Sequence, residues 1–95
     1  MRKYEITFIV RPDLEEAEIK KTADELKKLL KKDKAKLVEE KEEGQKELAY
    51  EIKKFSTGYY FLFVVEASNE TVAEFDRVAK INENLLRHLI VKVEE

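Results

Sequence analysis

Tyr59-Tyr60-Phe61-Leu62-Phe63-Val64-Val65 is the most apolar stretch of the sequence. Its aromatic and β-branched residues are typical of a strand. Because side chains alternate along a strand, Phe61, Phe63 and Val65 share one face and the residues between them share the other. Both faces are apolar, so we expect one to pack under helices and the other to need a separate partner.

A second strand is predicted at Tyr4–Val10, where every even-numbered residue is apolar and should face the helices. Arg11-Pro12-Asp13 ends this strand, since proline cannot donate to a ladder. We expect Asp13 to cap a helix that begins at Leu14. The apolar residues that follow repeat at helical spacing as far as Leu30.

The segment Lys36–Lys53 predicts one long, interrupted edge strand. Its many charged residues would oppose edge-to-edge aggregation, and Gly44 marks a bend or bulge. Phe55–Gly58 is the expected turn into the apolar strand. Ser68-Asn69-Glu70 should then cap a second helix, which Asn82–Asn84 ends, and His88–Val93 is the last predicted strand.

The resulting order, βαββαβ, predicts an α+β fold of the ferredoxin-like, split β-α-β type. We expect residues 1–95 to form a single domain. Its four-stranded antiparallel sheet would have the spatial order 4-1-3-2, with two helices on one face. The opposite face would then be open.

Composition excludes several classes of function. The 95 residues include no cysteine and one histidine, so we expect no disulfide, metal site or cofactor. No apolar run approaches the roughly 20 residues that span a bilayer, and no signal peptide is evident. A soluble, cytoplasmic protein without a membrane partner is expected. The net charge of −2 is unusual for a protein that binds nucleic acid without help.

The open face is the first candidate site, because apolar residues gather where a one-sided sheet should be polar. A patch of several hundred Å² would mark an interaction surface, whereas scattered exposed apolar residues are the ordinary alternative. The outward positions are Ile9, Tyr60, Leu62, Val64, Leu89 and Val91.

Basic residues give a second candidate site. Arg2, Lys3, Arg87 and Lys92 lie on two predicted neighbouring strands, and such side chains can bind phosphates and 2′-hydroxyls. An ordinary charged surface is the alternative. The lysines of residues 27–36 are better explained as a solvated helix end that complements the helix dipole.

Other patterns favour structural roles. Gly58–Phe63 resembles the RNA-recognition consensus only weakly, so its aromatic residues are expected in the core. His88 has no second histidine, serine or cysteine to act with, and packing at the sheet edge explains it better than metal binding. Acylphosphatases share this fold, but Arg11 has no glycine-rich anion loop beside it. We therefore expect no enzyme and no small-molecule substrate.

Several segments, spread over the whole chain, resemble the family of the sixth protein of the bacterial small ribosomal subunit. They are Met1-Arg2-Lys3-Tyr4-Glu5, Arg11-Pro12, Leu48-Ala49-Tyr50-Glu51-Ile52, Gly58-Tyr59, Glu74-Phe75-Asp76-Arg77, Ala79-Lys80-Ile81 and Arg87-His88-Leu89-Ile90-Val91-Lys92. The last twenty-odd residues are most similar to members from low-GC Gram-positive bacteria.

This resemblance implies a structural component of the ribosome. Members of the family bind the central domain of the small-subunit ribosomal RNA together with the eighteenth small-subunit protein. By analogy, the RNA-binding residues would be Arg2, Lys54, Lys80, Asn82, Asn84, Arg87 and Lys92.

Two departures from the family pattern leave an alternative open. After Gly44 the family has a basic tract, whereas this chain has Gln45-Lys46-Glu47; Asn82 and Leu86 also stand where relatives can carry arginine. The richness in Lys, Glu and Leu resembles a consensus or redesigned sequence. Such a scaffold would keep the fold and bind RNA weakly or not at all.

Overall fold

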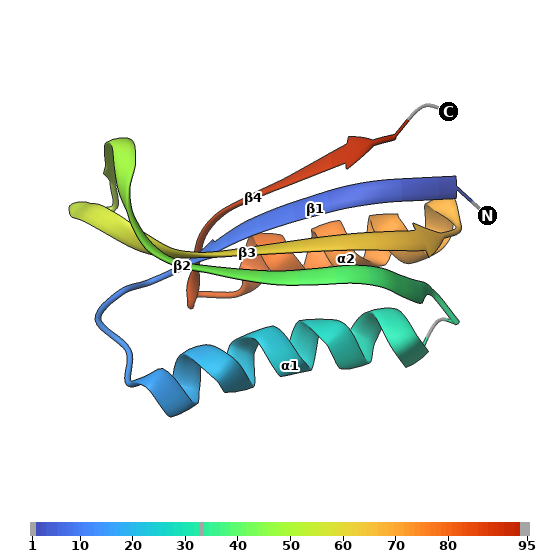
Figure 1. Ribbon diagram of the computed structural model, residues 1–95, viewed down its shortest axis with the longest axis horizontal. Helices are drawn as coiled ribbons and strands as arrows, with labels where there is room; N and C mark the ends of the chain where they lie inside the picture. Colours follow the sequence, from blue (N-terminus) through green and yellow to red (C-terminus); the bar gives the residue numbers. More distant parts are fainter. Residues whose placement is uncertain (1, 33, 94–95) are drawn as a thin grey trace.

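The computed structural model describes residues 2–32 and 34–93; Met1, Asp33, Glu94 and Glu95 lie outside this description. The elements are β1 (Arg2–Val10), α1 (Glu16–Lys32), β2 (Lys36–Ile52), β3 (Phe55–Ala67), α2 (Asn69–Ile81) and β4 (Leu85–Lys92). The strands form one antiparallel sheet in the order β2-β3-β1-β4, and both helices cover the same face (Figure 1). The predicted ferredoxin-like fold and strand order are confirmed.

The core lies between the sheet and the two helices. Tyr4, Ile6, Phe8 and Val10 of β1 are buried there, as predicted, and the first three pair with buried odd-numbered residues of β3. The Phe8 ring stacks on Phe61 and meets Phe63 edge-on, both with centroids 5.0 Å apart. Leu26 of α1 and Phe75 of α2 close the core from the helical side.

The first helix starts later than predicted. Two hydrogen bonds, of 3.0 and 2.8 Å, join the Arg11 guanidinium to the carboxylate of Asp13, so that carboxylate does not cap the helix. The carbonyl of Glu15 instead accepts bonds from the backbone N–H groups of Glu18 and Ile19. The helix consequently begins at Glu16, and the prediction of an Asp13 cap is wrong.

The turn between the second and third strands is also placed differently. Lys53 and Lys54 form it, with φ values of 50° and 71°, so the predicted turn at Phe55–Gly58 is wrong. The long edge strand is confirmed, and Gly44, at φ 85°, lies beside one of its register shifts. Figure 1 shows the hairpin of β2 and β3 curling away from α1 at its tip.

The second helix begins as predicted, with the Thr71 N–H donating to the Ser68 hydroxyl at 3.2 Å. It ends at Ile81, and the Asn82 N–H caps it by donating to a carbonyl of the last turn. The last strand begins at Leu85, three residues before the predicted start, because Leu85 and Leu86 are already buried against the rest of the sheet.

Candidate functional site

The face of the sheet opposite the helices carries exposed apolar side chains. Leu89 and Val91 of β4 are 53% and 45% exposed. Tyr60 and Leu62 of β3 are half-buried, and Val64 is buried at 9% exposure between its neighbours. Register places all five on this face, because each pairs with an odd-numbered residue of β1. The strand faces predicted from the alternation are therefore correct.

Ile9 differs from most of the other predicted partner-binding residues. It is only 7% exposed, although it points to the open side. The side chains of Ile9, Leu48 and Leu86 converge over Gly58, where the curled hairpin closes on the sheet. Ile9, like Val64, therefore offers little surface of its own to a partner, and its place in the partner-binding surface stays a prediction.

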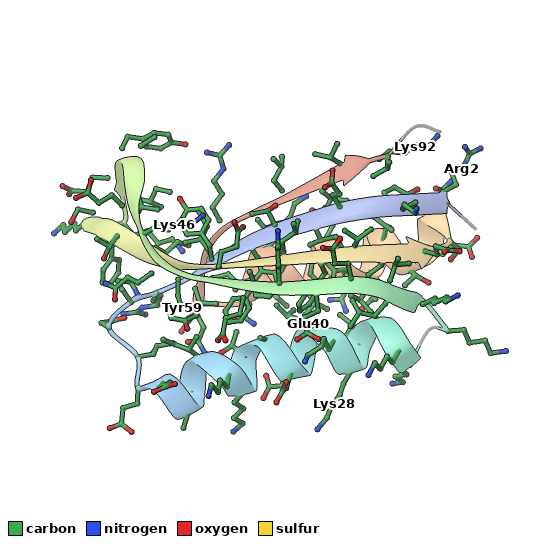
Figure 2. All side chains as sticks on the ribbon, viewed as in Figure 1. Arg2, Lys28, Glu40, Lys46, Tyr59 and Lys92 are labelled. Atoms are coloured by element: carbon green, nitrogen blue, oxygen red, sulfur yellow. The ribbon has the colours of Figure 1, made fainter. Side chains whose placement is uncertain are left out.

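The predicted RNA-binding residues fall into two groups at opposite ends of the neighbouring strands β1 and β4. Arg2 and Lys92 lie together at the end of the sheet where β1 begins (Figure 2). Arg87 pairs with Ile9 near the other end of the same strands. Lys92 follows Arg87 by five positions, which is about 17 Å along a strand. The two groups can therefore contact different parts of one long ligand.

Arg87 and Lys80 share a shallow pocket with Lys53, a residue that the sequence did not single out. This pocket has a volume of about 290 Å³ and a floor that includes Leu85 and Leu86. Nζ of Lys80 lies 3.0 Å from the Asp76 carboxylate, which neutralises part of its charge. The remaining cationic groups make the pocket suited to a phosphate.

Two more residues, Tyr50 and Lys54, complete this end of the sheet. The guanidinium of Arg87 donates to the hydroxyl of Tyr50 on the hairpin, a residue that sequence reasoning also missed. Lys54 is exposed in the hairpin turn beside Lys53. The adjacent lysines at positions 53 and 54 could have indicated Lys53 as a candidate from the sequence. Tyr50 could not have been found in this way, because only the curled backbone brings it to Arg87.

Asn82 and Asn84 have internal partners. The side-chain oxygen of Asn82 accepts a bond from the backbone N–H of Asn84 at 2.9 Å. The side-chain amide of Asn84 donates to the Thr22 hydroxyl at 3.1 Å, and the backbone carbonyl of Asn84 accepts from the backbone N–H of Arg11. These bonds fix the loop before β4 and so set the direction in which Arg87 emerges.

The lysines of α1 are surface charges, and two of them, Lys20 and Lys27, pair with nearby acids. Lys27 bonds to Glu40 at 2.6 Å, which raises the pKa of this lysine. Lys28 points away from the sheet (Figure 2).

Tyr59 of β3 lies between the sheet and α1 (Figure 2). Burial raises the pKa of its hydroxyl, which donates to Glu42 at 3.1 Å. The aromatic residues of β3 that resemble an RNA-recognition consensus are thus largely in the core.

His88 and Arg11 have structural partners. Nε2 of His88 lies 2.7 Å from the Asp76 carboxylate, and the hydrogen bonds from His88 and then Lys80 hold the pKa of Asp76 below its usual range. The Arg11 guanidinium binds Asp13 and lies 5.4 Å from the Phe55 ring centroid. Among residues 2–32 and 34–93, no three His, Cys, Asp or Glu side chains gather as a metal site.

None of the helices in residues 2–32 and 34–93 has the length and apolarity to cross a bilayer.

Residues 3–92 match the family described as Ribosomal protein S6. The small ribosomal subunit protein bS6 of Phytoplasma australiense is 44% identical over 92 residues, which cover 97% of this chain and 99% of that protein. The crystal structure of 30S ribosomal protein S6 from Thermotoga maritima is similar at a TM-score of 0.92 and 26% identity, covering 97% of this chain and 87% of that one. The chain therefore belongs to the ribosomal protein S6 family, and it is a component of the small ribosomal subunit.

Proposed function

We propose that the chain acts as a single, non-catalytic domain that binds the central domain of the small-subunit ribosomal RNA together with the eighteenth small-subunit protein. The observation that carries this proposal is the open sheet face. Two large apolar side chains, Leu89 and Val91, are about half exposed there, on the face of the sheet opposite both helices. A surface of this kind gains free energy when a partner removes it from water.

The protein partner is assigned to this face. Leu62, Leu89 and Val91 would form the centre of the contact, with Tyr60 and Val64 beside them. Ile9 lies beneath the hairpin and would support the surface from within.

The RNA is assigned to the two basic groups at the ends of β1 and β4. Arg2 and Lys92 would contact the backbone at one end, and Arg87, Lys80 and Lys54 at the other. Asn82 and Asn84 would contribute by holding the loop that presents Arg87. Since the chain has a net charge of −2, a basic partner would supply part of the counterion release that drives binding to RNA.

The absence of catalysis is part of the proposal. An acylphosphatase-type reaction would need a free guanidinium at the turn after β1. Arg11 is at that turn, but Asp13 binds its guanidinium through two hydrogen bonds. The family is one of structural ribosomal components, which supports the same conclusion.

The proposal is tested by titrating a labelled central-domain RNA fragment with the chain, with purified eighteenth protein, and with both. We expect strong binding only with both proteins, and an affinity that falls steeply as salt rises. Absence of RNA binding by the mixture would favour the alternative of a stable scaffold without ribosomal function. Binding by the chain alone, at the same affinity as the mixture, would remove the partner from the proposal.

A further inference from the structure

One row of the open face combines apolar and acidic side chains. The register pairs Glu39 of β2 with Val64 of β3, Val64 with Glu5 of β1, and Glu5 with Val91 of β4. Directly paired residues of neighbouring strands share a face, so these four side chains form one line across the sheet. Two carboxylates therefore flank Val64 within the surface assigned to the protein partner.

These two carboxylates are free to accept a cation from a partner. Both Glu5 and Glu39 are exposed, and neither takes part in an ion pair or side-chain hydrogen bond within residues 2–32 and 34–93. Some carboxylates elsewhere, such as Glu43 on the hairpin and Glu74 and Asp76 on α2, already have cationic partners. The nearest cations on the open face lie in the two adjacent rows, where Lys3 and Lys36 both pair with Glu66, and Lys41 pairs with Leu62.

A partner that covers the apolar side chains of this row must also cover Glu5. Removing a carboxylate from water without a compensating cation is strongly unfavourable, whereas a correctly placed cation offsets that cost and excludes other partners. Adjacent strands lie about 4.8 Å apart, so Glu5 and Glu39, two strands apart, are separated by roughly 10 Å. Cations at positions i and i+7 of a helix have about the same separation.

We propose that the open face selects a basic segment of its protein partner, in which an apolar side chain rests on Val64 and two cations pair with Glu5 and Glu39. This inference rests on the proposed docking of the partner to this face, and it adds the chemistry by which the partner is chosen. Glu5 contributes more than Glu39 to the choice of partner. It lies between Val64 and Val91, so its carboxylate loses water first when the apolar surface is covered.

Titration calorimetry of the full chain with the purified eighteenth protein tests the proposal. We expect Glu5→Gln to weaken binding at least about tenfold, and the double variant Glu5→Lys/Glu39→Lys to weaken it by about a hundredfold or more. Glu25→Lys, at an exposed position of α1, is the matched control and should change the affinity less than about twofold. Raised salt should weaken the wild type more than the double variant.

Leu62→Asp separates this inference from the proposed function. Loss of binding in Leu62→Asp with unchanged binding in the Glu5 and Glu39 variants would keep the docking face and overturn the charge selection. Unchanged binding in Leu62→Asp, or no binding by the wild type, would overturn both. Melting curves of each variant, expected within a few degrees of the wild type, exclude unfolding as the cause of any loss.

Discussion

Nη1 of Arg87 on β4 donates a hydrogen bond to the hydroxyl of Tyr50 on β2, 37 residues earlier in the chain. These two strands are opposite edges of the sheet, so the bond exists only because the hairpin of β2 and β3 curls over the open face (Figure 1). The hairpin thereby covers Ile9 and leaves Leu89 and Val91 uncovered. One contact thus links the end of the apolar surface to the basic group assigned to RNA.

Replacing Arg87 by glutamate should weaken RNA binding by the complex of the chain with its partner by about tenfold or more. The substitution removes a cation from the pocket shared with Lys53 and Lys80 and brings a negative charge toward phosphate. The melting temperature should change little, because Arg87 is exposed. Fluorescence anisotropy at several salt concentrations measures both the affinity and the salt slope, which should fall by about one.

Lys28→Glu is the control for this experiment, since Lys28 points away from the sheet (Figure 2). It makes the same change of net charge on the opposite side of the molecule and should leave the affinity close to that of the wild type. An unchanged affinity in Arg87→Glu would remove Arg87 from the RNA-binding site.

Gly58→Ala should destabilise the fold by about 1–3 kcal/mol. A Cβ atom at this position would lie 2.3 Å from Cγ2 of Ile9, with Leu48 and Leu86 also close, so the hairpin must move away from β1. Urea denaturation measures the loss. Ile9→Ala removes the clashing methyl group, so the double variant should lose less stability than the sum of the two single variants. If the two losses are additive, the added Cβ atom does not clash with Ile9, and another part of the structure moves to make room for it.

Alternation of apolar residues was sufficient to predict which face of β1 and β3 is buried, because that period follows from strand geometry alone. The turn at Lys53–Lys54 could not be predicted, since lysine rarely adopts the positive φ found at both positions. The cap at Asp13 failed because a nearby guanidinium competed for its carboxylate.

For the site, the sequence supplied the residue types but not their grouping. The register of β4 separates Arg87 from Lys92 and Arg2, and the curl of the hairpin adds Tyr50 and Lys53. The ribosomal location in the cytoplasm, expected from the resemblance, follows from membership of the family.

Phe63→Ala should cost about 3–5 kcal/mol in the free energy of unfolding. Phe63 is fully buried, and its ring meets Phe8 edge-on, so truncation leaves a cavity under both helices. Tyr60→Ala, three residues earlier on the opposite face, is the control and should cost clearly less, since Tyr60 is only half-buried. Equal losses in the two variants would contradict the division of β3 into a core face and an open face.

The contacts of Asp76 with His88 and Lys80 should make stability depend on pH. Hydrogen bonds from His88 and Lys80 hold the pKa of this carboxyl below its usual range in the folded chain. A carboxyl whose pKa is lower in the folded chain than in the unfolded chain stabilises the fold at pH values above its unfolded pKa, which is about 4. This stabilisation is lost as the pH falls through the pKa of the folded chain. Asp76→Asn should therefore lower the melting temperature at pH 7, and the difference from the wild type should shrink below about pH 4 and vanish at still lower pH.

Glu25→Gln, which removes an exposed carboxylate of α1, is the control for loss of one negative charge and should show a smaller difference at pH 7. The measurement is a series of thermal melts from neutral to acid pH. A difference for Asp76→Asn that stays constant over the whole range would mean that Asp76 acts through packing and hydrogen-bond geometry, since only a charged carboxylate loses its contribution on protonation.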